Sequence, residues 1–230
     1  MKIAMIGSGA AGSVFASYLR RGGADMTLVD VYKAHMDKVA ADGMTFRIDP
    51  DQSYHLDGFK TAYSADEIGI MDAVIFLTKA TQLENAIIGA APCIGPETVV
   101  ISLINGLGNE DKLLKYHPAN RCMIGSGSIG TVLDGPGMCT SYPNGGVVVN
   151  FGTIETSSRS VEVGKQLEKY FNEGGAKAVF REDILDKVLV KPPGLHLPPG
   201  LAHAVVLPVY QLFGELPGVV RVVDVAILLH

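Results

Sequence analysis

The segment that constrains the fold most is a glycine-rich turn near the amino terminus. Residues 7–12 read Gly-Ser-Gly-Ala-Ala-Gly, after an apolar run at 2–6 and before a helical pattern at 10–21. In a β-α-β unit, the first glycine of this pattern bends the chain, the second admits a pyrophosphate to the backbone, and the third lets helix and strand pack closely. Because the helix starts at the turn, its free amides face a bound anion. The pattern predicts a dinucleotide-binding turn made of Gly7, Ser8, Gly9, Ala10, Ala11 and Gly12.

An acidic residue follows where a dinucleotide ribose is normally recognised. Asp30 ends the next predicted strand, 26–30, close to the ~20-residue spacing of a ribose-binding carboxylate. A carboxylate there accepts hydrogen bonds from the hydroxyls of NAD and repels the 2′-phosphate of NADP, although the nearby Lys33 would offset that charge. The alternatives are an ordinary strand-end aspartate and a solvated lysine at a helix start. Asp30 therefore favours NAD.

The pattern beyond the turn alternates between short apolar runs and helical periodicity, which is typical of an α/β protein with a parallel sheet. Strands are predicted at 2–6, 26–30, 72–78, 98–103 and 176–180, and helices at 10–21, 34–41, 81–90 and 158–173. Between 121 and 151, short apolar runs lie among Gly, Pro and Asn, which predicts antiparallel strands and turns. We therefore expect a doubly wound sheet of the Rossmann type.

Composition restricts the partners of this chain. The net charge of −5 argues against nucleic acid as the main partner, because phosphate binding needs a basic patch. The three cysteines, Cys93, Cys122 and Cys139, have no C-x-x-C spacing, which excludes a disulfide framework and most zinc sites and suits a reducing compartment. No apolar run reaches the ~20 residues of a membrane-spanning helix. We expect a cytoplasmic protein that binds neither a metal nor a membrane.

Two polar residues follow neighbouring predicted strands. Lys79 comes after the strand at 72–78, and Asn105 comes after the strand at 98–103. Because the carboxyl ends of parallel strands meet at the edge where α/β proteins bind ligands, we expect these side chains to lie beside one another near a cofactor. Taken singly, each has a simpler explanation as a surface lysine and a turn-forming Asn-Gly pair.

Together these motifs resemble the ketopantoate reductase (2-dehydropantoate 2-reductase) family of the 6-phosphogluconate-dehydrogenase-like superfamily. The resemblance rests on 1–12, Leu77-Thr78-Lys79-Ala80 and Asn105-Gly106-Leu107-Gly108, and it continues through 125–137 and more weakly to Lys191. It implies a Rossmann domain at 1–181. Residues 182–230 would then be the start of a helical domain that binds substrate and forms a homodimer. It also implies NADPH-dependent reduction of a small 2-oxoacid, 2-dehydropantoate, to (R)-pantoate, on the route to pantothenate and coenzyme A.

The same resemblance assigns roles to three residues. Lys79 matches the family lysine near cofactor and substrate, Asn105 matches the asparagine that helps hold them, and Lys191 matches the general acid. An ammonium beside a ketone stabilises the charge that develops on oxygen and then donates a proton, most effectively when desolvation lowers its pKa. The alternative for Lys191 is a solvated lysine paired with Asp183 or Asp186.

The family pattern fails after Lys191. Leu195 and Pro199 stand where asparagines are expected, and Pro192-Pro193 would stop a helix. We expect the helical domain at 182–230 to be incomplete. Our hypothesis is that the reading frame is shifted from Pro192 to about Leu207, and that the true chain continues past His230. Two other functions stay open: another 2-oxoacid or 3-hydroxyacid dehydrogenase of the superfamily, and a non-catalytic dinucleotide-binding protein.

Overall fold

The computed structural model describes residues 1–49, 51–106, 108–143, 145, 148–182 and 184. The helices are α1 (Ala10–Arg21), α2 (Lys33–Asp42), α3 (Leu83–Gly89), α4 (Asn109–Leu114) and α5 (Ser158–Glu173). The strands of the larger sheet are β1 (Lys2–Ile6), β2 (Asp25–Val29), β5 (Lys60–Ala62), β6 (Ala73–Phe76), β7 (Val99–Ser102), β8 (Cys122–Gly127), β11 (Val149–Thr153) and β12 (Ala178–Arg181). The strands of the smaller sheet are β3 (Met44–Ile48), β4 (Gln52–Leu56), β9 (Gly130–Gly135) and β10 (Met138–Tyr142).

The larger sheet has the order β12-β11-β8-β7-β6-β1-β2-β5. The strands from β5 to β8 are parallel, and β11 turns back antiparallel to β8. Ile6 pairs with both Val29 and Phe76, and Phe76 pairs with Ser102. The carboxyl ends of β1, β2, β6 and β7 therefore lie level, at one edge of a Rossmann-type sheet.

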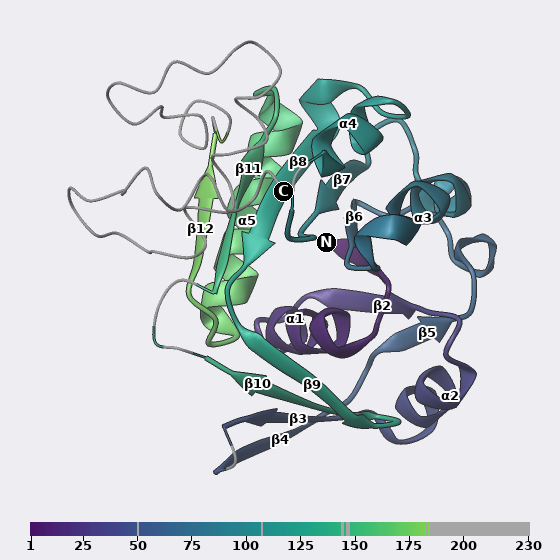
Figure 1. Ribbon diagram of the computed structural model, residues 1–230, viewed down its shortest axis with the longest axis vertical. Coiled ribbons are helices and arrows are strands. Elements are labelled where there is room, and N and C mark those ends of the chain that lie inside the picture. Colours follow the sequence, from purple (N-terminus) through teal and green to yellow (C-terminus); the bar gives the residue numbers. More distant parts are fainter. Residues whose placement is uncertain (50, 107, 144, 146–147, 183, 185–230) are drawn as a thin grey trace, which may run out of the picture.

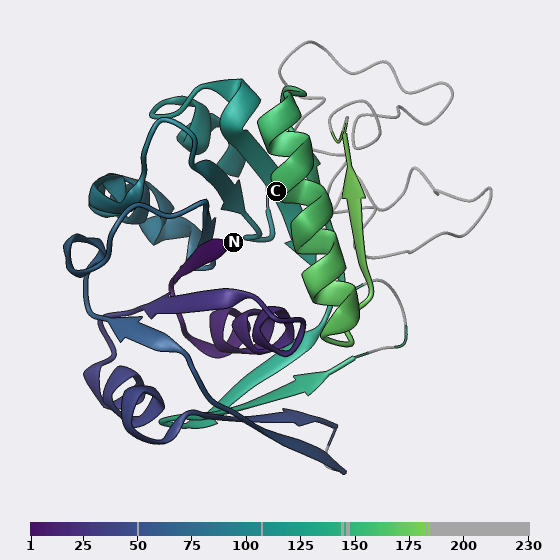
Figure 2. The ribbon, with the colours of Figure 1, turned by 180° about the vertical axis from the view of Figure 1, so that it is seen from behind.

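Helices cover both faces of this sheet. Ile3 and Met5 of β1 face a core shared with α1 and α5, whereas Ala4 and Ile6 face a core shared with α3 and α4. The two views in Figures 1 and 2 show α5 running along one side of the sheet while α3 and α4 lie on the other. Burial on both faces explains why these strands read as unbroken apolar runs rather than alternating ones.

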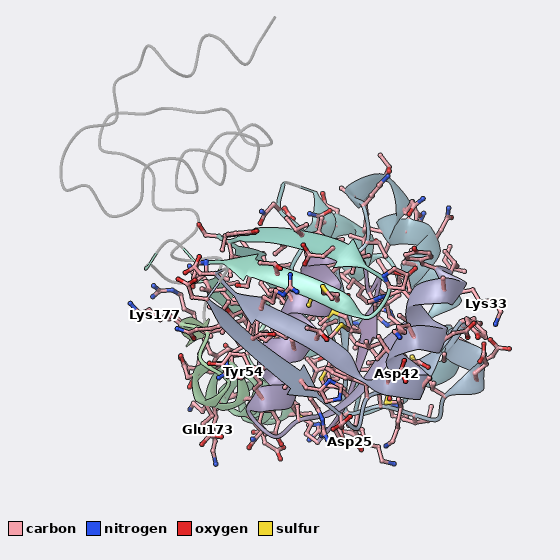
Figure 3. All side chains as sticks on the ribbon, turned by 90° about the horizontal axis from the view of Figure 1, so that it is seen from below. Asp25, Lys33, Asp42, Tyr54, Glu173 and Lys177 are labelled. Atoms are coloured by element: carbon pink, nitrogen blue, oxygen red, sulfur yellow. The ribbon has the colours of Figure 1, made fainter. Side chains whose placement is uncertain are left out.

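The smaller sheet packs against α1 at the lower end of the molecule in Figure 1. Its order is β4-β3-β10-β9, and β10 runs parallel to β3 although the two are far apart in the sequence. The Tyr18 ring packs edge-on against Phe46 at 4.9 Å between centroids, and the Tyr18 hydroxyl lies 2.7 Å from Ser141 Oγ. Figure 3 shows this sheet from below, with Tyr54 on it and Lys33 projecting from α2 beyond it.

The structure confirms most of the expected elements and differs from the expectation in several places. α1 and α5 begin and end at the predicted residues. The expectation for 121–151 was wrong in part: β9 with β10 and β8 with β11 are antiparallel, but β8 is parallel to β7, so it extends the main sheet. The hairpin β3-β4 was not predicted, although Met44–Ile48 alternates apolar with polar residues, and β5 and α4 were not predicted either. Lys191 and almost all of 182–230 lie outside the described residues.

Candidate functional site

The turn between β1 and α1 uses each of its three glycines for a different reason. Gly7 has a φ of +90°, and a Cβ there would lie 2.8 Å from the Thr78 amide nitrogen. A Cβ on Gly12 would lie 1.9 Å from the carbonyl oxygen of Gly7. A Cβ on Gly9 would meet nothing within 4 Å. Gly7 and Gly12 are thus required by the fold, whereas Gly9 leaves open space beside the backbone, where a phosphate group fits.

The first turn of α1 presents free amides at the same place. Gly9 is the N-cap residue and supplies no side-chain cap, and the first hydrogen bond of the helix runs from the Ser13 amide to the Gly9 carbonyl at 2.9 Å. The amides of Ala10, Ala11 and Gly12 therefore have no carbonyl partner within the helix. The first turn contains no acidic residue. A helix end of this kind attracts anions, so the residues of the turn fit a dinucleotide pyrophosphate.

Asp30 lies directly against the turn. One carboxylate oxygen accepts the Ser8 amide at 2.7 Å, and the other accepts the Tyr32 amide at 2.9 Å. The residue is only half-buried, and each carboxylate oxygen can accept a second hydrogen bond. Asp30 therefore keeps free acceptor capacity, and ribose binding by it stays a prediction; it also holds the turn in place, a role that the sequence did not reveal.

Lys33 is the first residue of α2, and its ammonium has hydrogen-bond and ion-pair partners in the same chain. Its Nζ lies 2.7 Å from the Tyr63 hydroxyl and 3.0 Å from Asp37 Oδ2. Hydrogen bonds to Tyr63 and Asp37 raise the pKa of Lys33. Lys33 thus sits at a helix start with partners of its own, and its side chain remains largely exposed, at the outer end of α2 in Figure 3.

Lys79 and Asn105 reach the same edge of the sheet. Each lies three positions beyond a paired residue, Phe76 of β6 and Ser102 of β7. Lys79 is exposed and precedes a short 3-10 turn, and within the described part of the chain its ammonium forms no hydrogen bond or ion pair. The edge where the sequence places these two side chains is therefore the edge that carries the glycine-rich turn.

The Asn105 side chain is tied to the neighbouring strand. Its Nδ2 donates to the Gly127 carbonyl at 3.1 Å, and its Oδ1 accepts the Gly127 amide at 3.2 Å. Asn109, which was not predicted as a site residue, shapes the same loop, because its Nδ2 donates to the carbonyls of Ile104 and Gly106. In the sequence, the Asn-Gly pair at 105–106 indicates a turn here, but it does not single out Asn109. Asn105 thus fixes the end of β8 relative to the end of β7.

Other kinds of site find little support in the described part of the chain. The three cysteines are buried free thiols, and burial raises the pKa of Cys93 to about 11 and those of Cys122 and Cys139 to about 12. In the part of the chain that the structure describes, no group of three His, Cys, Asp or Glu side chains could hold a metal ion. None of the described helices is long and apolar enough to cross a membrane.

Comparison with known proteins identifies the family. Residues 3–155 match the family model for ketopantoate reductase PanE/ApbA. The chain belongs to this family. The 2-dehydropantoate 2-reductase of Lactococcus lactis (strain IL1403) is 30% identical over 186 residues, which cover 80% of this chain and 58% of the relative. That of Streptococcus pyogenes serotype M1 is 28% identical over 188 residues, covering 82% and 59%. The chain thus spans less than two thirds of these relatives.

Solved structures of D-mandelate dehydrogenase and of a 2-dehydropantoate 2-reductase share the fold. D-mandelate dehydrogenase in complex with NADH is 27% identical, with a TM-score of 0.65, and the match covers 80% of this chain and 56% of that one. Its ternary structure with NADH and anilino(oxo)acetate gives a TM-score of 0.66 at 27% identity, covering 83% and 61%. The 2-dehydropantoate 2-reductase of Porphyromonas gingivalis W83 (23% identity, TM-score 0.68, covering 80% and 65%) agrees in fold. The predicted Rossmann-type sheet and the predicted family are therefore confirmed.

Proposed function

We propose that this chain carries the dinucleotide-binding part of a 2-dehydropantoate 2-reductase, which transfers a hydride from NAD(P)H to the ketone of 2-dehydropantoate and yields (R)-pantoate. The observation that carries the proposal is the glycine-rich turn, because Gly9 leaves space for a phosphate while Gly7 and Gly12 are fixed by close packing. Family membership supports the substrate class.

The cofactor that the site favours is NAD rather than NADP. The Asp30 carboxylate lies 2.7 Å from the Ser8 amide of the turn, where it would accept ribose hydroxyls and repel a 2′-phosphate. Lys33 is held by Asp37 and Tyr63, which reduces its capacity to offset that charge. The two D-mandelate dehydrogenase structures, both solved with NADH, support the same choice.

The chemistry assigns distinct tasks to three side chains. A nicotinamide dinucleotide, when bound, supplies the hydride. Reduction of a ketone leaves negative charge on its oxygen, which a nearby ammonium stabilises before donating a proton. We assign the general acid to Lys191, which lies outside the described residues, and charge stabilisation to Lys79. Asn105 holds the loop beside them through its two hydrogen bonds to Gly127.

The remaining proposals concern the whole protein. Residues 1–181 form the dinucleotide-binding domain, and residues 182–230 begin a helical domain for substrate binding and homodimer formation. The protein acts in the cytoplasm on a small 2-oxoacid.

The test is an assay of the full chain with 2-dehydropantoate, following the absorbance of NADH and of NADPH. We expect oxidation that depends on 2-dehydropantoate and is faster with NADH. Replacing Lys79→Met keeps the length of the side chain but removes its charge, and should lower turnover by about 100-fold while NADH affinity changes less than threefold. Lys191→Ala should act in the same way. Equal losses of affinity and turnover would contradict the assigned roles.

A second candidate is a reductase of another 2-oxoacid. The likeness to D-mandelate dehydrogenase favours it, since that enzyme is solved with anilino(oxo)acetate, whose amide carbonyl adjoins a carboxylate as the ketone of a 2-oxoacid does. Offering phenylglyoxylate beside 2-dehydropantoate in the same assay separates the two, because the true substrate gives the higher kcat/KM. NADH binding with no turnover of either acid would instead support the non-catalytic dinucleotide-binding protein.

A further inference from the structure

A histidine of α2 lies buried behind the glycine-rich turn. His35 is fully buried, and it connects α1 with the smaller sheet. Its Nε2 lies 3.0 Å from Ser13 Oγ, and its Nδ1 lies 2.9 Å from the amide nitrogen of Gly137, in the turn between β9 and β10. None of these residues contributes to the proposed chemistry, although Ser13 belongs to the first turns of α1.

The hydrogen bonds of His35 define where its proton lies. The Gly137 amide can only donate, so Nδ1 must accept and carries no proton. A neutral ring then holds its single proton on Nε2, which donates to Ser13 Oγ. The Ser13 hydroxyl in turn donates to the carbonyl oxygen of Ser8 at 2.8 Å. All the bonds therefore run in one direction, from Gly137 through His35 and Ser13 to Ser8.

The last of these bonds fixes the orientation of the peptide between Ser8 and Gly9. That peptide is planar, and in the trans form its carbonyl and its amide point in opposite directions. Because Ser13 holds the Ser8 carbonyl inward, the Gly9 amide is directed outward. Gly9 is exposed, with open space beside its Cα. The outward direction is therefore the one from which a phosphate would approach.

We propose that His35 is a positioning residue for the dinucleotide phosphates: acting through Ser13, it holds the peptide between Ser8 and Gly9 so that the Gly9 amide faces the ligand. The same bonds make the β9-β10 turn part of the support of the binding site, through the Gly137 amide. This inference rests on the proposed dinucleotide binding and adds to it the residues that set the phosphate-binding geometry.

The test compares two serines on the same helix. Ser13→Ala removes the link between His35 and Ser8. Ser17→Ala is the matched control, because Ser17 is equally buried one turn further along, donates to the Ser13 carbonyl, and lies 3.7 Å from Cys139 Sγ, away from the Ser8 peptide. With the full chain, NADH titration should show binding weakened about tenfold in Ser13→Ala and less than twofold in Ser17→Ala. Thermal unfolding should show similar losses for both variants.

Histidine variants test the other end of the same chain of bonds. His35→Gln retains an N–H donor near the position of Nε2, whereas His35→Leu fills the space without one. We expect NADH affinity within threefold of the native chain for the first and about tenfold lower for the second. Nitrogen-15 NMR of the imidazole, without ligand, should show the proton on Nε2. If His35→Leu does not fold, Ser13→Ala and the NMR measurement decide.

Different failures have different meanings. A native chain that binds NADH while Ser13→Ala binds it equally well would overturn the role of His35 and leave the proposed function intact. A ring protonated on Nδ1 would have the same meaning. A native chain that binds neither NADH nor NADPH would overturn the proposed function and this inference together.

Discussion

The glycine-rich turn and the pair Lys79–Asn105 lie at the same edge of the sheet, yet they are built in different ways. In the turn, backbone groups face the site, and their directions are set from behind by Asp30 and Ser13. In the pair, side chains project beyond the strand ends: Lys79 is exposed, and Asn105 is bound to the Gly127 backbone. A ligand that meets the turn finds its donors already oriented, which lowers the entropic cost of binding.

This difference implies that binding and turnover depend on separate parts of the structure. Changes in the turn should alter dinucleotide affinity or folding, because its atoms are either packed or directed at the phosphates. Changes in the pair should alter turnover with little effect on affinity. The following experiments test that separation.

The largest effect is expected from Gly12→Ala, and Gly9→Ala in the same turn serves as its comparison. Gly12→Ala places a Cβ 1.9 Å from the Gly7 carbonyl, so folding stability should fall by about 3 kcal/mol. Gly9→Ala meets nothing within 4 Å and has a negative φ of −69°, so stability should change by only about 0.5 kcal/mol. NADH titration should nevertheless show about tenfold weaker binding for Gly9→Ala. Thermal unfolding measures the first effect, and equal stability of the two variants would contradict the packing argument.

Asn105→Ala should affect turnover next most strongly. It removes both bonds to the Gly127 backbone, and the loss of an oriented loop should lower turnover by about 100-fold. NADH affinity should stay within threefold of the native value. Steady-state kinetics and NADH titration together measure the split. Asn105→Asp, which still accepts the Gly127 amide but no longer donates, serves as the control. Its turnover should lie between that of the native chain and that of Asn105→Ala.

Asp30→Asn should shift cofactor preference by a smaller amount. The amide oxygen can replace one carboxylate acceptor for the Ser8 and Tyr32 amides, and the charge that repels a 2′-phosphate is lost. We expect the ratio of NADH to NADPH affinity to fall about tenfold. Asp30→Ala is a poorer probe, because it leaves both amides without an acceptor. An unchanged ratio would show that the carboxylate does not face the ribose.

The smallest effect concerns pH. Burial lowers the pKa of His35, and the negative charge of Asp30 acts in the opposite direction with a smaller effect. The Tyr32 ring stacks on the His35 ring at 6.1 Å between centroids. Because an unfolded histidine titrates near ~6.5, below that pH the unfolded chain binds more protons than the folded chain, so stability falls as the pH drops. Burial shifts His117 in the same direction. Between about pH 7 and about pH 5, the Tm should fall by roughly 2 °C less in His35→Gln than in the native chain.

Much of the fold could be predicted from local sequence. The bounds of α1 follow from the turn before it and Gly22 after it, and Ser157 marks the start of α5 with a capping box. The smaller sheet could not be predicted in the same way. Its β10–β3 pairing joins residues 138–141 to residues 45–48, and no local pattern encodes a parallel pairing between segments so far apart.

The site was predictable only where the backbone requires particular residues. Glycine at 7 and 12 is visible in the sequence because both positions have a steric reason, and Gly9 is visible because it completes the spacing of a dinucleotide-binding turn. His35 and Ser13 carry no such signature, since a histidine and a serine on amphipathic helices usually face solvent. One signal was present: His35 lies four residues before the buried Val39 and next to the buried Met36, which places it on the covered face of α2.

The parallel pairing of β10 with β3 also has a consequence during protein synthesis. β3 pairs with β4 on one side, and its other edge is completed only by β10. On the ribosome, that edge and the core residues Met44 and Phe46 must wait for about ninety further residues to emerge. An interrupted or slowly translated chain would therefore present an open strand edge beside apolar side chains, the combination that favours aggregation or capture by a chaperone.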